Sequence, residues 1–229
     1  MPLRRAFALL VLPGIIATWA LCSRIRSVSA SPQEALVGGC DGCEAIFQGR
    51  PATLSPTARI ATPAEPGEPL VLEGVVRDAS RRPRAGIIVY AYHTDARGEY
   101  PREGADPTPA ARRHGRLRGF ARTDAAGRYR FETIRPAPYP GRDIPQHIHM
   151  QILEPGRCHY YIEDVVFTDD PLLTPAQRKR HAGPRGGRGI VAPRRTPVKQ
   201  GDRTVSTWLV QRDIVLGAGI PGYAGCGAK

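Results

Sequence analysis

The chain has 229 residues, of which 41% are hydrophobic, so it can bury the core of one ordinary domain. Its 25 glycines and 23 prolines indicate many turns and exclude a helix-rich fold. The formal net charge is +12, and residues 1–30 contribute four arginines and no carboxylates, which leaves +8 for the rest.

Residues 1–30 have the pattern of a signal peptide. A basic start is followed by an apolar run from Ala6 to Cys22 and by a small-residue cleavage pattern at 28–30. The stretch Arg4-Arg5-Ala6-Phe7 also resembles the R-R-x-F core of a twin-arginine export signal. We therefore predict an exported protein, periplasmic or secreted, that meets a membrane only through this signal or an uncleaved anchor.

Four cysteines lie beyond the predicted signal, and their even number agrees with export to an oxidising compartment. Cys40, Cys43, Cys158 and Cys226 predict two disulfides, with three connectivities that the sequence leaves open. The alternative is a four-cysteine zinc site built on the C-x-x-C pair Cys40 and Cys43, which ranks behind because there is only one such pair.

After the signal, residues 31–67 read as an irregular segment, and residues 68–229 read as one β-sandwich domain with long loops. Alternating apolar residues between turn signals predict strands at 69–78, 86–94, 117–134 (a hairpin turning at 124–127), 146–155, 158–167 and 204–216. One short helix is predicted from Thr174, which would cap it, with Pro175 at its first position. The predicted fold class is all-β with little helix.

The motif T-D-x-x-G-x-Y occurs twice, at 94–100 and at 123–129. Asp and Gly are typical turn residues, so two similar turns explain the repetition without a true internal repeat. The motif nevertheless offers two comparable tyrosines, Tyr100 and Tyr129.

A basic run covers residues 178–195, with seven Arg or Lys and no carboxylate. Such a run could bind nucleic acid, but it has no interleaved aromatic residues and lies among glycines and prolines. We therefore predict no nucleic-acid partner. A solvated loop, or a surface that attracts anionic aromatic compounds, explains the run better.

Two histidines one residue apart suggest a metal site. On a strand, His147 and His149 point to one face while Ile148 points to the other, which brings the two rings close enough to share an ion. Eight residues earlier, Tyr139 lies between two prolines. Phenolates suit Fe(III), whereas zinc prefers Cys, His and carboxylate ligands.

These pieces, in this order, resemble the intradiol ring-cleavage dioxygenases of the catechol and protocatechuate type. The resemblance runs from about Leu70 to Phe167 and rests on "LEGVVRD", "GIIVYAYHTDARGEY", "RGFARTDAAGRYRFETIRPAPYP" and "HIH". It implies a β-sandwich that holds one non-haem Fe(III), acts on a small aromatic diol and O2, and produces a muconate-type diacid. The ligands implied are Tyr100, Tyr139, His147 and His149.

The resemblance also implies two catalytic residues. Tyr139 would leave the metal when the diol binds and accept a substrate proton. Catabolic relatives carry an arginine three residues before the histidine pair, where this chain has Ile144, so Arg142 is the candidate for that charge. A polar partner is expected on the next strand, at Glu163 or Asp164. The alternative function is an exported aromatic-binding module of the same fold without turnover, and the oligomeric state is not predicted.

Overall fold

The computed structural model describes residues 34–40, 42–200 and 202–227. The predicted signal peptide over 1–30 lies outside these ranges. Within them, no helix is long and apolar enough to cross a membrane.

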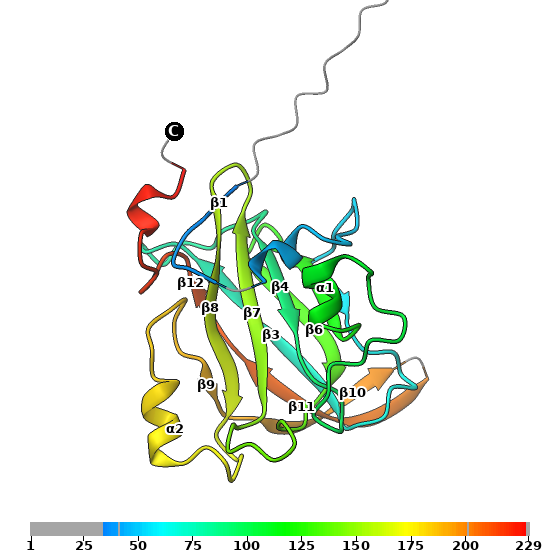
Figure 1. The fold of residues 1–229 in the computed structure, drawn as a ribbon. Helices are drawn as coiled ribbons and strands as arrows, with labels where there is room; N and C mark the ends of the chain where they lie inside the picture. The colour runs from blue at the N-terminus through cyan, green and yellow to red at the C-terminus, as the bar shows by residue number, and fades with distance from the viewer. Residues whose placement is uncertain (1–33, 41, 201, 228–229) are drawn as a thin grey trace, which may run out of the picture. The chain divides into compact units, whose positions relative to one another are not determined.

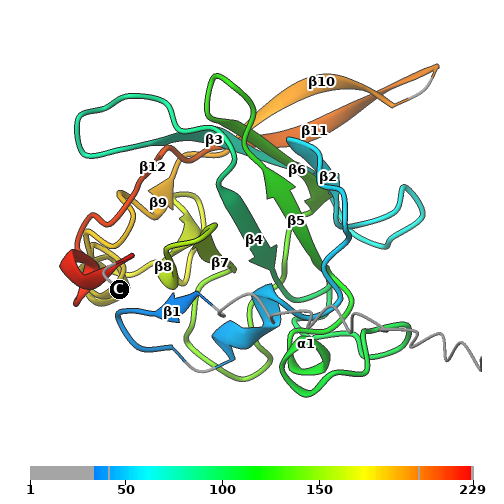
Figure 2. The same ribbon diagram turned by 90° about the horizontal axis from the view of Figure 1, so that it is seen from above.

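Two sheets form the body of the described unit, and Figures 1 and 2 show them facing each other. The first sheet has the order β1 (Ala35–Leu36), β8 (Cys158–Phe167), β7 (His147–Glu154), β4 (Ile88–Tyr92) and β5 (Arg118–Arg122), and β9 (Ile190–Val191) also pairs with β8. The second has the order β10 (Arg194–Gln200), β11 (Arg203–Gln211), β3 (Pro69–Arg77), β6 (Arg128–Ile134) and β2 (Thr57–Arg59), and β12 (Ile214–Val215) also pairs with β3. The prediction of an all-β sandwich with little helix is confirmed.

Strand alternation decides which residues fill the space between the sheets. Along β7, the side chains of Ile148, Met150 and Ile152 are buried in the main hydrophobic cluster. Because neighbouring side chains on a strand point to opposite faces, His147 and His149 lie on the outer face of the first sheet. The histidine pair is therefore displayed away from the core.

Two short elements that the sequence did not reveal cover part of this outer face. The 3-10 helix η1 (Cys43–Ile46) packs against α1 (Pro109–Arg113). Ile46 and Ala110 join Tyr90 in a second hydrophobic cluster on this side of the sheet. Elements of four or five residues are too short to show a helical period, so hydrophobic spacing does not predict them.

The C-terminal part differs from the prediction in its strands. The predicted strand over 204–216 is interrupted at Arg212 and Asp213, which separates β11 from β12. β10 begins at the end of the basic run and pairs antiparallel with β11. The predicted short helix is present as α2 (Pro175–Arg180), and the hydroxyl of Thr174 accepts a hydrogen bond from the backbone N–H of Gln177 at 3.3 Å.

The four cysteines beyond the predicted signal form two disulfides, Cys40–Cys43 and Cys158–Cys226. This pairing resolves the connectivity that the sequence left open, and it excludes the alternative of a four-cysteine zinc site. The second disulfide ties the C-terminal segment to the first residue of β8.

Candidate metal centre

The structure brings all four predicted ligands together on the outer face of the first sheet. The phenol oxygens of Tyr100 and Tyr139 lie 2.6 Å apart. The oxygen of Tyr139 is 3.1 Å from Nε2 of His147 and 3.2 Å from Nε2 of His149, and these two nitrogens are 3.1 Å from each other. We refer to Tyr100, Tyr139, His147 and His149 as the four-donor site.

The two tyrosines arrive on separate loops that are held against each other. The hydroxyl of Thr94 donates to the carbonyl of Ala137 at 2.7 Å, and the N–H of Ala137 donates to the carbonyl of Asp95 at 3.1 Å. Gly98 has φ +82°, and a Cβ at this position would lie 2.0 Å from the carbonyl oxygen of Pro138. The glycine of the first T-D-x-x-G-x-Y motif is thus required for the approach of the two tyrosine-bearing loops.

The second copy of the motif forms the same turn, but its tyrosine lies in a different part of the structure. Asp124 accepts hydrogen bonds from the backbone N–H groups of Ala126 and Arg128, as Asp95 does in the first copy from Arg97 and Glu99. Tyr129 follows this turn into the core, where it is 1% exposed and its hydroxyl donates to the carbonyl of Arg212 at 2.6 Å. Tyr129 therefore has a structural partner and lies outside the four-donor site.

Hydrogen bonds on the far side of each imidazole fix which nitrogen faces the centre. Nδ1 of His147 lies 2.7 Å from the carbonyl oxygen of Pro145, and Nδ1 of His149 lies 2.8 Å from a carboxylate oxygen of Asp164. Both acceptors require a proton on Nδ1, so in each neutral ring Nε2 presents a lone pair to the centre.

Two imidazole lone pairs that face each other at 3.1 Å repel unless a positive charge lies between them. The hydroxyl proton of Tyr139 satisfies only one of the two rings. Burial raises the pKa of Tyr100 and of Tyr139, so neither phenol ionises near neutral pH without a cation. Two imidazole nitrogens and two potential phenolates therefore fit a hard, highly charged cation, which would relieve the repulsion and stabilise the phenolates.

The electrostatic surroundings keep the ring of His147 neutral and the supporting carboxylate charged. Burial, together with the neighbouring His149, lowers the pKa of His147 to about 4. Burial opposes ionisation of Asp164, but His149 and hydrogen bonding outweigh it and hold the pKa of this carboxyl below its usual range. Asp164 contacts the Nδ1 side of His149, so it orients this ring, as carboxylates behind metal-binding histidines commonly do.

The structure separates the two candidates for the polar partner on the next strand. Asp164 reaches His149, whereas Glu163 lies 3.8 Å from the guanidinium of Arg185. Tyr161, which the sequence did not single out, donates its hydroxyl to Asp164. The register between β7 and β8 shifts at Ile148/Met150, so residue spacing alone could not identify these contacts.

Arg142 lies beside the four-donor site with an exposed side chain. Its backbone N–H donates to the carbonyl of Tyr139 at 3.2 Å, and its charge is close enough to oppose the rise in the pKa of Tyr139. Ile144, at the position of the expected arginine, is half-buried. Behind the centre, the ring of Tyr92 stacks on His149 with a centroid distance of 4.6 Å.

Comparison with known proteins gives one family and several distant relatives. The family model described as "Dioxygenase" matches residues 46–180. The chain is 29% identical over 143 residues to catechol 1,2-dioxygenase 1 of Acinetobacter lwoffii, which covers 53% of this chain and 44% of the relative. It is 30% identical over 112 residues to the protocatechuate 3,4-dioxygenase beta chain of Burkholderia cepacia. This match covers 47% of the present chain and 48% of that relative. The chain spans about half the length of these relatives.

Solved structures agree with the fold. Catechol 1,2-dioxygenase from Acinetobacter sp. ADP1 superposes with a TM-score of 0.56 at 22% identity, over 75% of this chain and 59% of that chain. Hydroxyquinol 1,2-dioxygenase from Pseudomonas putida DLL-E4 gives a TM-score of 0.54 at 20% identity, over 83% and 68%. At these identities the likeness concerns the fold alone.

Proposed function

The chain belongs to the intradiol dioxygenase family, and we propose that it is a non-haem Fe(III) enzyme that cleaves a catechol-type ring between its two hydroxylated carbons. The observation that carries this proposal is the four-donor site, in which two phenol oxygens and two bare imidazole nitrogens meet at 2.6–3.2 Å. Both Nδ1 atoms are engaged elsewhere, so this arrangement serves a cation better than it serves a hydrogen-bond network.

Tyr100, Tyr139, His147 and His149 would hold the ion. When bound, ferric iron supplies a Lewis acid that draws electron density from the aromatic diol and prepares its ring for reaction with O2. The two phenolates would balance two of the three positive charges. His149 is held in place by Asp164 on one side and by the ring of Tyr92 on its face.

Tyr139 is the residue best suited to move a proton. It lies in the loop between β6 and β7, whereas Tyr100 packs on Tyr92 at a centroid distance of 6.0 Å within a hydrophobic cluster. Burial raises the pKa of the Tyr139 phenol, so a Tyr139 phenolate that is not bound to a cation would take up a proton readily. Its oxygen accepts this proton from a hydroxyl of the substrate.

Arg142 would supply positive charge near the entering substrate. Its exposed side chain is free of any carboxylate within 4 Å in the part of the chain that the structure describes, and its charge acts on Tyr139. A mobile surface arginine stabilises a developing anion less than a buried, fixed one, because water screens it. This chain has Ile144 where the catabolic relatives carry an arginine, so we expect a lower turnover rate than in those relatives.

The proposed reaction consumes one diol and one O2. The bond between the two hydroxylated carbons breaks, and both oxygen atoms enter the product, which is a muconate-type diacid. The test is oxygen consumption by the iron-loaded protein with catechol, protocatechuate, hydroxyquinol and lignin-derived catechols, with the product identified by mass spectrometry. Diacid formation from at least one diol supports the proposal.

Ile144 also favours a second candidate, an aromatic-binding module of the same fold without turnover. In that case the protein would bind iron and change colour when a catechol is added, yet it would consume no oxygen with any diol of the series. Oxygen uptake therefore separates the two candidates.

We also propose that the protein is exported. The two disulfides support an oxidising compartment, and the pattern in residues 1–30 supports a signal. Expression of the full chain with its own N-terminus, followed by cell fractionation and mass spectrometry, tests this proposal. Processed protein outside the cytoplasm is the expected result, and full-length protein confined to the cytoplasm would contradict it.

A further inference from the structure

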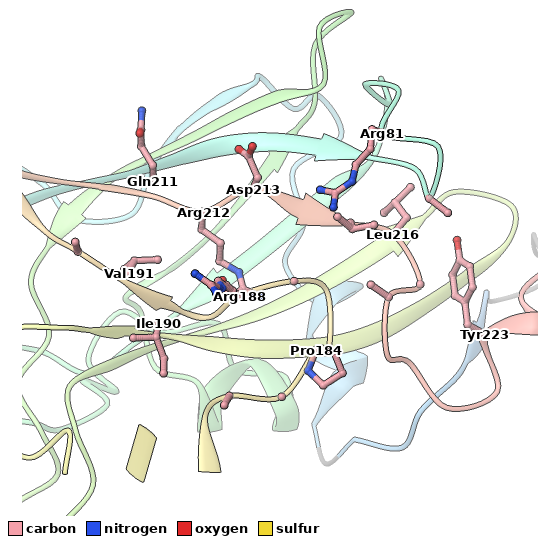
Figure 3. A pocket seen from close by; sticks show the side chains of 18 residues that line it. Arg81, Pro184, Arg188, Ile190, Val191, Gln211, Arg212, Asp213, Leu216 and Tyr223 are labelled. Atoms are coloured by element: carbon pink, nitrogen blue, oxygen red, sulfur yellow. The ribbon is translucent and has the colours of Figure 1, made fainter. Parts of the chain in front are cut away.

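A cavity lies at the edge of the sandwich, away from the four-donor site. It has a volume of about 1000 Å³ and is bordered by the loop before β9 and by the segment from β12 onward. Figure 3 shows from close by the side chains that line it, which come from several separate segments of the chain. None of the four donors lines it.

Apolar side chains form much of the wall of this cavity. Ile190 and Val191 of β9 lie on one side, and Val215, Leu216 and Pro184 complete the apolar surface. Val191 and Leu216 are largely buried, so this surface is continuous with the core. A wall of this kind favours a ligand with an apolar body, since such pockets bind by removing apolar surface from water.

Three arginines, Arg81, Arg188 and Arg212, contribute positive charge to the same cavity, which we name the arginine pocket. They come from three segments that are distant in sequence. Arg81 belongs to the turn after β3, where its backbone has φ 65°. Among the described residues, no carboxylate lies within 4 Å of any of the three guanidinium groups. The carboxylate of the lining residue Asp213 is engaged elsewhere, because it accepts from the N–H of Val75 at 3.0 Å.

Arg212 is the most unusual of the three because it is buried, with 1% of its surface exposed. Its guanidinium donates to the carbonyl of Arg188 at 2.8 Å and to that of Arg185 at 3.5 Å. Its Nε has no hydrogen-bond partner in the described ranges. The carboxylates of Asp164 and Glu163 attract this guanidinium only through space, without an ion pair within 4 Å, so its charge is only partly balanced and adds positive potential beneath the pocket.

We propose that the arginine pocket is a second ligand site that binds a carboxylate with an aromatic or other apolar body. The exposed guanidinium groups of Arg81 and Arg188 match a carboxylate, which arginine binds through paired hydrogen bonds. Arg212 adds attraction through its field rather than through contact, because its guanidinium is covered. The apolar wall selects against small inorganic anions.

The test is isothermal titration of the full chain with 2-naphthoate, compared with the neutral 2-naphthalenemethanol and with inorganic phosphate. Naphthoate is expected to bind at least about tenfold more tightly than either comparison compound, as a charge-assisted contact added to apolar burial requires. Arg188→Gln should weaken naphthoate binding roughly tenfold. Ala182→Trp, at an exposed position on the rim, should block it.

Two controls distinguish this site from the proposed catalytic one. His147→Ala removes a donor of the four-donor site and should leave naphthoate binding unchanged, even if the proposed dioxygenase activity is wrong. Arg112→Gln removes an exposed arginine on α1 and should also have no effect. Naphthoate binding that disappears in His147→Ala but persists in Arg188→Gln and Ala182→Trp would overturn the proposal. Equally tight binding of phosphate, or no binding of naphthoate, would overturn it as well.

Discussion

The four-donor site and the arginine pocket suit ligands of opposite charge. In the four-donor site, two phenol oxygens and two imidazole nitrogens are linked by contacts of 2.6–3.2 Å, and we propose that a cation holds them together. In the arginine pocket, the buried guanidinium of Arg212, with no described carboxylate within 4 Å, lies beside about 1000 Å³ of space, and we propose that it attracts an anion. A metal site is thus recognised by the convergence of donors, and an anion site by charge left without a partner.

The largest expected effect separates the tyrosines of the four-donor site from Tyr129, the second tyrosine of the repeated motif. Tyr139→Phe should reduce turnover by about 10²–10⁴-fold, because it removes both a ligand and the acceptor of the substrate proton. Tyr129→Phe should leave turnover and colour unchanged and cost about 1 kcal/mol of stability, since it loses only the hydrogen bond to the Arg212 carbonyl. Steady-state kinetics and urea unfolding measure the two effects.

If Tyr129→Phe abolished the colour while Tyr139→Phe kept it, the assignment of the second phenol ligand would be wrong. Tyr100→Phe completes the set, and it should impair iron binding because Tyr100 is the remaining phenol of the four-donor site.

The next effect concerns stability on the side of the arginine pocket. The disulfide Cys158–Cys226 spans 68 residues, and loss of such a cross-link costs about 4 kcal/mol in the chain-entropy model. The double variant Cys158→Ala/Cys226→Ala should therefore unfold at lower urea, and it should loosen the C-terminal segment that carries Tyr223 into the pocket wall. Iron content should remain, because no donor lies on that segment.

The matched control is Cys40→Ala/Cys43→Ala, which opens a loop with a separation of only 3 residues. The same model gives a loss of about 2 kcal/mol, so its unfolding midpoint should fall less. Equal losses for the two double variants would mean that loop length does not determine the contribution of these cross-links.

Acid should destabilise the fold through its buried imidazoles, which titrate, and not through the guanidinium groups of the arginine pocket, which do not. His93 is fully buried, and burial, only partly offset by the hydrogen bond to the Thr94 carbonyl, lowers its pKa from 6.5 to about 4. The unfolded chain takes up this proton below about pH 6.5 while the folded chain does not, so stability is lost as the pH falls from 6.5 to 4. The loss amounts to about 3 kcal/mol.

His93→Asn should therefore reduce the slope of unfolding free energy against pH between 7 and 4.5, measured by urea titration, while His147, whose pKa is also lowered to about 4, continues to contribute. An unchanged slope in this variant would show that His93 does not carry the acid sensitivity.

The smallest effect concerns the support behind His149. Asp164→Asn keeps the size of the side chain but removes the charge that orients the ring, so the affinity for iron should fall about 10–100-fold. Glu163→Gln, on the adjacent residue, faces Arg185 and should leave the affinity unchanged. Competition with a chelator measures the iron affinity of both variants. Equal affinities would show that Asp164 does not support the metal-binding histidine.

The two regions also differ in how far the sequence predicts them. Strand alternation places His147 and His149 on one face, and the family motifs identify Tyr100 and Tyr139. The sequence between residues 100 and 149 therefore predicts the whole four-donor site. Arg81, Arg188 and Arg212 carry no such signal, because only the tertiary fold brings three distant segments to one cavity. Tyr161 escapes prediction for a related reason, since the shift in register between β7 and β8 hides its approach to Asp164.

The same limit applies to the fold. Long alternating strands such as β3 and β8 follow from the apolar pattern, whereas η1, α1 and β9 are too short to produce one. The break between β11 and β12 is equally hidden, because "QRDIVL" reads as a continuous strand until the burial of Arg212 is known.

The most direct test of the four-donor site is the metal content and visible spectrum of the purified full chain after reconstitution with ferrous iron in air. We expect about one iron per chain and a visible phenolate-to-iron absorption band that shifts when a catechol is added without oxygen. A colourless protein that retains no iron, or that prefers zinc at these four residues, would contradict it.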